Sequence, residues 1–147
     1  MYPRILIPTD GGACSGEVIA QGVAIARAMG SSVVFLFVMD GMSSRREGVV
    51  TVADAVRTLS VHGQAILQSA EMTATAAGVA ADGELVEGSP PDVIVERSVD
   101  FDLVVMGSHG RGLLKQLVLG SVTQDVLHRI ARPMLVVRCS HDRAGRG

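Results

Sequence analysis

The chain has 147 residues, with 13 basic and 15 acidic side chains, so its formal net charge at pH 7 is −2. This length suits one compact domain that buries an ordinary hydrophobic core without disulfides or metals. Because the charge is slightly negative and only 3% of the residues are aromatic, the chain lacks the cationic surface and the stacking platform typical of nucleic-acid-binding proteins. DNA and RNA are therefore not expected as partners.

The apolar segments are too short for a membrane protein. The most continuous apolar run, 33–39, is far shorter than the roughly 20 residues that cross a bilayer. Residues 1–4 lead directly into a strand-like segment, without the h-region and cleavage site of a secretory signal. We therefore expect a soluble, cytoplasmic protein with no membrane partner.

The cysteines and histidines do not indicate a reactive or metal centre. Cys14 and Cys139 are far apart in the sequence, which favours two reduced, partly buried thiols over a structural or redox bridge. The four histidines show no metal-ligand spacing with one another or with cysteine. No metal site is predicted.

The first strand and helix are clearly marked. Residues 5–7 form a short β-branched run that ends in the loop 8–12, which predicts a buried strand delivering the chain into a turn. Apolar residues then recur at helical spacing over 18–29, and Gly30 stands where a left-handed terminating residue belongs.

The second strand and helix are longer. Residues 33–38 are apolar without alternation, a pattern typical of a strand covered on both faces in a parallel sheet. A polar loop follows at 40–48. Apolar residues over 52–77 repeat every 3.6 positions and stop at Gly78, which predicts a long amphipathic helix.

The middle of the chain predicts an edge strand and a short helix. Residues 79–87 mix apolar and charged side chains, so a strand there should lie near a sheet edge. Ser89 is placed to cap a helix that has Pro90 at its first position and Asp92 completing a capping box, and this helix should extend to about Ser98.

The last third predicts a strand, a helix and a final strand. Residues 103–106 form another fully apolar strand. Ser121 and Gln124 suggest a second capping box at the start of a helix, which Pro133 must end. Residues 134–137 make the last strand.

Five strands alternating with four helices define an α/β protein with a parallel sheet. We expect a single doubly wound domain with helices on both faces of the sheet and the strand order 3-2-1-4-5. Ligands of such sheets bind beyond the carboxyl ends of the strands, where the strand order reverses. The loops after the first and fourth strands meet there, and both are rich in glycine.

The loop after the fourth strand carries the spacing G-x2-G-x9-G-S. Its members are Gly107, Gly110, Gly120 and Ser121. Glycines permit positive φ and close approach of the backbone to a polyphosphate, and a serine at a helix N-terminus lies where anions are favoured. His109, Arg111 and Lys115 supply nearby donors.

Two other phosphate-binding patterns do not fit this loop. A Walker loop needs Lys and then Ser or Thr after its second glycine, whereas Gly112 is followed by two leucines. A dinucleotide-binding GxGxxG needs a third glycine where this chain has Lys115.

Residues 106–138, MGSHGRGLLKQLVLGSVTQDVLHRIARPMLVVR, resemble the signature region of the universal stress protein family, whose nucleotide-binding members carry G-x2-G-x9-G-[ST]. The opening RILIPTDGG resembles that family too, although two glycines follow Asp10 where the family often has one small residue. The likeness implies a Rossmann-like domain over 1–140 with a short polar tail at 141–147, and a homodimer, which we expect to form through the last strand.

The resemblance implies an ATP site. The glycines and Ser121 would hold the phosphates, the loop after the first strand would contact the adenosine, and the end of the second strand would wall the adenine. The expected nucleotide-binding residues are Pro8, Thr9, Asp10, Val38, Met39, Gly107, His109, Gly110, Arg111, Gly120, Ser121, Val122 and Thr123. Whether Mg2+ accompanies the ATP stays open, as does the alternative that Asp10 only caps the first helix.

The implied function is an ATP-binding regulatory or stress-response switch. A slow ATPase or phosphotransferase and a chaperone-like dimeric scaffold with an incidental nucleotide remain as alternatives. No carboxylate occurs between Leu103 and Val122, so we assign no catalytic residue and expect binding without efficient turnover.

Overall fold

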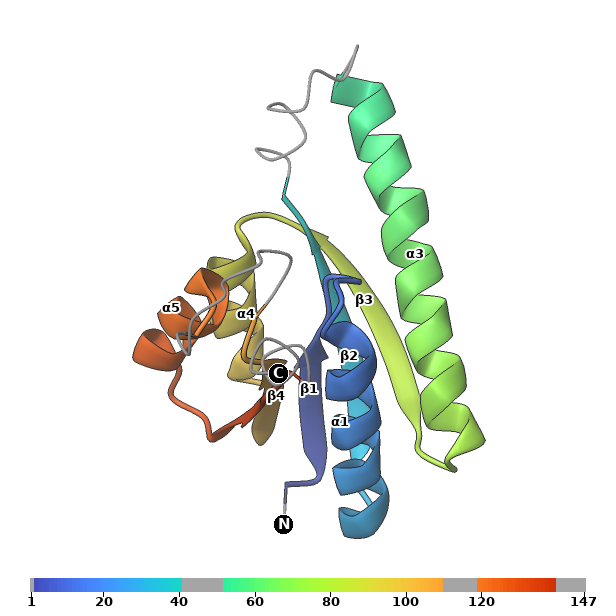
Figure 1. The fold of residues 1–147 in the computed structure, drawn as a ribbon, viewed down its shortest axis with the longest axis vertical. Helices are drawn as coiled ribbons and strands as arrows, with labels where there is room; N and C mark the ends of the chain where they lie inside the picture. Colours follow the sequence, from blue (N-terminus) through green and yellow to red (C-terminus); the bar gives the residue numbers. More distant parts are fainter. Residues whose placement is uncertain (1, 41–51, 110–118, 140–147) are drawn as a thin grey trace, which may run out of the picture.

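The computed structural model describes residues 2–40, 52–109 and 119–139, which form a five-stranded parallel sheet flanked by helices (Figure 1). The strands are β1 (Arg4–Pro8), β2 (Ser32–Met39), β3 (Ala81–Glu87), β4 (Leu103–Gly107) and β5 (Met134–Val137). The helices are α1 (Ser15–Met29), α3 (Val52–Ala76), α4 (Pro90–Ser98) and α5 (Ser121–Arg129). The strand order β3-β2-β1-β4-β5 confirms the predicted topology.

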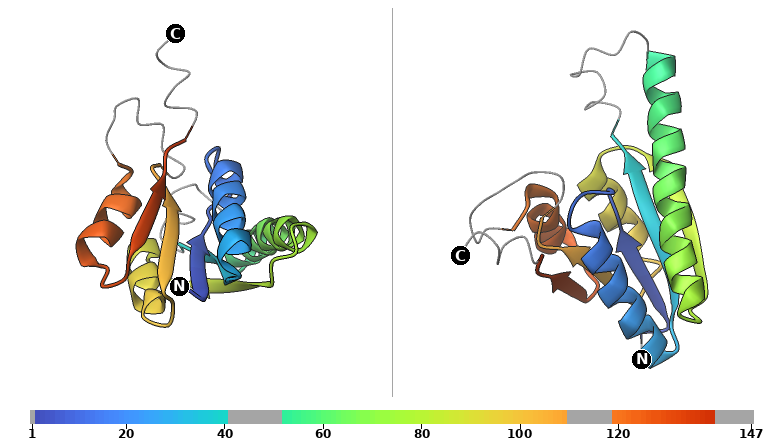
Figure 2. Two further views of the ribbon diagram at one scale, coloured as in Figure 1. Left: turned by 90° about the horizontal axis from the view of Figure 1, so that it is seen from below. Right: turned by 45° about the vertical axis from the view of Figure 1, so that its right-hand side comes forward.

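The helices lie on both faces of the sheet. α1 and α3 cover one face, and α4 and α5 cover the other (Figure 2). In β1, Ile5 and Ile7 belong to the core under α1 and α3, whereas Leu6 belongs to the core under α4 and α5. Because both faces are buried, the inner strands are apolar without alternation.

The predicted edge strand is confirmed. β3 pairs only with β2 in the sheet order, and its residues are half-buried or exposed. Of the polar loop expected at 40–48, only Asp40 is among the described residues, and the tail at 141–147 lies outside them. Within the described ranges, no helix combines the length and apolar character needed to cross a membrane.

The two glycine terminators are confirmed, since Gly30 and Gly78 have φ values of 67° and 77°. Both predicted capping boxes are wrong. Ser89 is the N-cap of α4, but its side chain makes no capping bond, and Pro91 at the second helical position has no N–H to offer one. The N-cap of α5 is Gly120, so Ser121 is already the first helical residue.

Arg97 fixes α4 against the edge strand β3. Its guanidinium donates to both carboxylate oxygens of Glu84, Nε to Oε2 at 2.9 Å and Nη2 to Oε1 at 2.6 Å. This hydrogen bonding raises the pKa of Arg97 above its ordinary value. The guanidinium also lies 5.7 Å from the ring centroid of Phe101. The pair holds α4 so that Pro90 and Ile94 border the cavity described below.

Candidate functional site

A cavity of about 530 Å³ lies at the carboxyl ends of β1 and β4, the neighbouring strands at which the order reverses. Its volume falls in the range of small-molecule sites, roughly 300–1,000 Å³. The predicted site residues that line it are Pro8, Thr9, Asp10, Val38, Gly107, His109, Gly120, Ser121, Val122 and Thr123. Met39 is not among the lining residues, and Gly110 and Arg111 lie outside the described residues.

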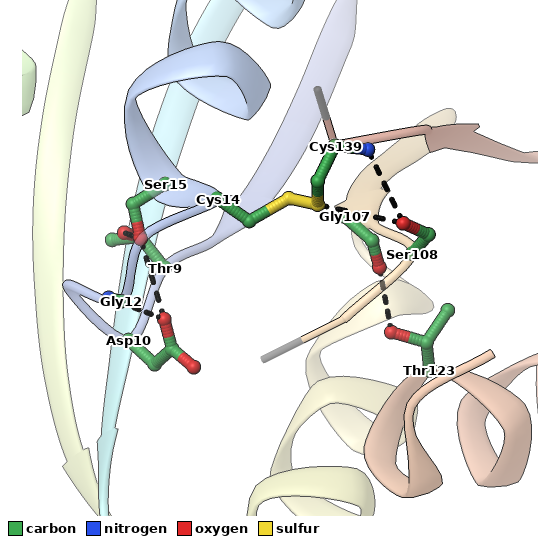
Figure 3. Close-up of a disulfide and its surroundings, with 9 residues drawn as sticks. All are labelled: Thr9, Asp10, Gly12, Cys14, Ser15, Gly107, Ser108, Thr123 and Cys139. Carbon is green, nitrogen blue, oxygen red and sulfur yellow. Dashed lines mark hydrogen bonds between the residues drawn. A yellow bond between two sulfur atoms is a disulfide. The ribbon is translucent and has the colours of Figure 1, made fainter. Parts of the chain in front are cut away.

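The loop after β1 is closed by Asp10. Its Oδ1 accepts hydrogen bonds from the backbone N–H of Gly12 at 2.8 Å and from the Ser15 hydroxyl at 3.3 Å. Asp10 does not occupy the N-cap of α1, which is Cys14. The second carboxylate oxygen of Asp10 points away from these two donors (Figure 3).

The two glycines after Asp10 have a structural reason. Gly11 has a φ of 73°, which side-chain-bearing residues rarely adopt, and a Cβ there would collide with Cδ1 of Ile66. The next residue, Gly12, supplies the N–H that Asp10 binds. The departure from the family's usual spacing therefore forms a tight turn that packs against α3.

The motif glycines at 107 and 120 do not adopt the positive-φ conformation that favours glycine. Gly107 lies outside the positive-φ region, and Gly120 has a φ of −56°. A Cβ on Gly107 would lie 2.9 Å from Cγ2 of Val18 and 3.0 Å from Sγ of Cys14. The expectation of positive φ is wrong for these two glycines, and the close contact at Gly107 is with Val18 and Cys14 of the protein itself.

The N-terminus of α5 contributes backbone donors. The first intrahelical bond runs from the N–H of Gln124 to the carbonyl of Gly120, at 2.9 Å. The preceding N–H groups, those of Ser121, Val122 and Thr123, therefore have no partner one turn back in the helix. All three residues line the cavity.

At the end of β2, Val38 and Met39 direct their backbone groups to opposite sides of the strand. The carbonyl of Leu36 accepts a bond from the N–H of Thr9, so even-numbered residues in this strand direct their backbone groups toward β1. β1 is last paired at Pro8, opposite Leu36, so the N–H and C=O of Val38 are directed past the end of β1. Met39 faces the other way, and its carbonyl accepts from Gly88.

Several lining residues were missed by the sequence reading. They are Cys14, Ser15, Val18, Leu36, Phe37, Asp40, Thr58, Leu59, His62, Pro90, Ile94 and Met106. Asp40 could have been found, because it follows β2 at the same edge of the sheet as Asp10 follows β1. The contribution of α3 had no such signal, since its place beside the cavity depends on how the helix crosses the sheet.

The expectation of two reduced, unpaired cysteines is wrong. Cys14 and Cys139 form a disulfide with their Cα atoms 5.4 Å apart (Figure 3). Each cysteine follows a strand, β1 or β5, and parallel strands end at the same edge of a sheet. The sequence separation of 125 residues concealed this proximity.

In the described parts of the chain, no group of three or more His, Cys, Asp or Glu side chains is arranged to hold a metal ion. The site is thus a cavity bordered by backbone donors, hydroxyls and apolar side chains, at the switch point of a doubly wound sheet. This arrangement is that of a small-ligand-binding α/β protein.

Comparison with known proteins identifies the family. The model of the universal stress protein family matches residues 1–138, and the chain belongs to this family. It is 32% identical to universal stress protein MJ0531 of Methanocaldococcus jannaschii, over 94% of this chain and 83% of that protein.

Two solved structures share the fold and more than a quarter of the sequence. The hypothetical protein MJ0577 of the same organism superposes with a TM-score of 0.85 at 28% identity, covering 94% of this chain and 96% of that one. A universal stress protein in complex with cAMP gives a TM-score of 0.68 at 26% identity, covering 93% and 97%.

Proposed function

We propose that this chain binds ATP in the cavity between β1 and β4 and acts as a nucleotide-responsive regulatory switch. The observation that carries the proposal is that one cavity is bordered both by groups suited to an adenine edge and by groups suited to phosphates. The outward backbone of Val38 lies at one side, and the N-terminal N–H groups of α5 lie at another. The relative that binds cAMP supports an adenine-containing ligand.

The adenine would be held at the end of β2. The edge of an adenine presents an amine that donates and a ring nitrogen that accepts, so a backbone C=O and N–H on one strand edge can pair with both. Val38 offers such groups beyond the last residue of β1. Guanine carries an oxygen in place of that amine, which would face the carbonyl of Val38, so the arrangement selects adenine.

The phosphates would be held at the start of α5. N–H groups that have no partner one turn back in the helix, together with the positive end of the helix dipole, favour anions there. The hydroxyl of Ser121, at the first helical position, adds a further donor. Gly107 and Gly120 keep side chains away from the approach, and His109 borders the same part of the cavity.

The ribose would lie near Asp10. Because Oδ1 of Asp10 is engaged in the turn with Gly12 and Ser15, the carboxylate is fixed in orientation before any ligand binds. Its outward oxygen would accept from a ribose hydroxyl or contact a magnesium ion that accompanies the nucleotide.

A switch is favoured over an enzyme by the chemistry of the cavity. The carboxylates among its described lining residues are Asp10 and Asp40, which follow β1 and β2. Neither belongs to α5 or to the loop that precedes it, where the phosphates would lie. Phosphoryl transfer depends on positioning a nucleophile in line with the transferred group, and neither carboxylate is placed for that task.

We also propose that the chain forms a homodimer through β5. This strand is at the edge of the sheet, and Leu135 on it is 38% exposed. An exposed apolar edge strand is a natural site for pairing with a second copy.

Mass spectrometry of small molecules released from the purified protein tests the nucleotide proposal. We expect an adenine nucleotide in substoichiometric or stoichiometric amount, and ATP should rebind after its removal. If the protein releases no nucleotide and takes up none at millimolar ATP, the proposed function is wrong.

A further inference from the structure

Cys14 and Cys139 lie where two parts of the proposed nucleotide site are joined. Cys14 lines the cavity and is the N-cap of α1, directly after the turn that Asp10 closes. Cys139 follows β5 and is only 2% exposed. Their disulfide therefore links the loop after β1 to the chain beyond β5 across the carboxyl edge of the sheet (Figure 3).

Ser108 connects this disulfide to the start of α5. Its hydroxyl accepts from the N–H of Cys139 at 3.3 Å and donates to Sγ of Cys139 at 3.4 Å. The carbonyl of Ser108 accepts from the N–H of Gly120, the N-cap of α5, at 2.6 Å. A movement of Cys139 is thus passed through one residue to the helix terminus that would hold the phosphates.

The disulfide also packs on the first motif glycine. Sγ of Cys14 lies 3.0 Å from the place that a Cβ on Gly107 would occupy. Gly107 in turn accepts a hydrogen bond from Thr123 on α5. The cysteine pair therefore contacts the phosphate side of the cavity at both Gly107 and Ser108.

From these contacts we propose that Cys14 and Cys139 form a reversible redox couple that sets the nucleotide affinity of the cavity, the disulfide state binding more tightly. The inference rests on the proposed function, since it names the regulation of that same site. In the oxidised state the bond holds the loop after β1, Ser108 and the start of α5 in the binding arrangement. In the dithiol state Cys139 is no longer tied to Cys14, and this arrangement loosens.

The chemistry is ordinary thiol–disulfide exchange with a dithiol reductant. A thiolate of the reductant attacks one cysteine sulfur, the Cys14–Cys139 bond breaks, and the other cysteine leaves as a thiolate that takes up a proton. The second thiol of the reductant then displaces the first cysteine, so the reductant ends as a cyclic disulfide and both cysteines end as thiols. Two electrons and two protons pass to the protein.

The cavity is the approach route for the reductant. Both cysteines are buried, at 7% and 2% exposed, and Cys14 borders the cavity. A nucleotide in the cavity would cover this approach. Bound ATP should therefore slow reduction, besides shifting its equilibrium.

The test measures ATP affinity and redox state together on the full chain. Protein equilibrated in oxidised or reduced dithiothreitol, a dithiol whose oxidised form is a cyclic disulfide, is titrated with ATP, and its free thiols are counted by alkylation. We expect no free thiol and tight binding in the first buffer, and two free thiols and about tenfold weaker binding in the second. By linkage, saturating ATP must then lower the midpoint potential of the couple by about 30 mV.

Two variants separate redox control from a structural role. Cys139→Ser should bind ATP at the reduced level in both buffers. Ser108→Ala should still form the disulfide but show a smaller difference in affinity between the two buffers, because the contact to Cys139 is lost.

The outcomes distinguish this inference from the function on which it rests. Equal ATP affinity in both redox states of the wild-type chain overturns the inference and leaves the nucleotide site intact. Two titratable thiols in the oxidising buffer overturn it as well. Absence of ATP binding in both states overturns both the inference and the proposed function.

Discussion

The hydroxyl of Thr123 donates a hydrogen bond of 2.8 Å to the backbone carbonyl of Gly107. This bond joins the first turn of α5 to the last residue of β4, and Thr123 is only 3% exposed. The bond fixes the N-terminus of α5 at the edge of the cavity. The position of the backbone N–H groups there therefore depends on the hydroxyl of Thr123.

Thr123→Val, which keeps the shape but removes the donor, should lower the free energy of unfolding by about 1–3 kcal/mol, because the partly buried carbonyl of Gly107 loses its partner. The same variant should weaken ATP binding. Thr123→Ser is the matched control, which keeps the hydroxyl and should lose only about 0.8 kcal/mol for the buried methyl group. Chemical denaturation of the three proteins measures this order, and a Val variant as stable as wild type would contradict it.

Gly107 and Gly120 should respond differently to substitution. Gly107→Ala should destabilise the fold by about 1–3 kcal/mol through overpacking, because its Cβ would press on Val18 and Cys14. Thermal unfolding of the variant tests this expectation. An unchanged melting temperature would show that the contact at this glycine is loose.

Gly120, buried at the start of α5, is the position whose substitution acts most directly on the backbone donors of the helix terminus. Its φ of −56° and ψ of 153° are open to any residue, and Asn and Asp are both good N-caps. Gly120→Asn should therefore keep the helix start and weaken ATP binding by more than about tenfold, or 1.4 kcal/mol. Gly120→Asp has the same size with a negative charge and should bind more weakly still. Unchanged affinity in both would make this loop a structural turn.

The proposed dimer has a test that follows from the register of β5. The carbonyls of Pro133 and Val137 accept bonds from β4, so odd-numbered residues face β4 and Val136 faces the free edge. Val136→Pro removes a donor at that free edge, so light scattering should show a monomer. Thermal unfolding of this variant should resemble that of the wild type. Leu135→Pro, its control, should instead break the ladder to β4. A wild-type monomer at micromolar concentration would rule out the dimer.

Hydrolysis should be absent or far below the roughly 1–100 per second of typical kinases. A single-turnover assay with radiolabelled ATP and Mg2+ measures it. Rapid product formation that disappears in Asp10→Ala or His109→Ala would mean that the site is catalytic.

The fold was accessible from the sequence because its signals are local. Apolar runs such as 33–38 mark buried strands, glycines such as Gly30 mark helix ends, and alternation of the two elements limits the topology. The capping box predicted at Ser121 failed because a one-residue change in where a helix begins alters the role of every residue in its first turn.

The site was only partly accessible. Residues that follow β1 and β4 could be placed by the rule that ligands bind at the switch point. The cavity wall formed by α3, including His62, and the bond between Cys14 and Cys139 depend on tertiary packing between segments distant in the sequence. No pattern along the chain encodes these contacts.

Calorimetric titration of the oxidised, nucleotide-free chain with ATP and with GTP tests the central claim most directly. The arrangement of Val38 and α5 predicts one ATP per chain and a weaker or undetectable response to GTP. Equal affinity for both nucleotides would contradict recognition of adenine by the edge of β2, and no heat of binding with either would contradict the nucleotide site itself.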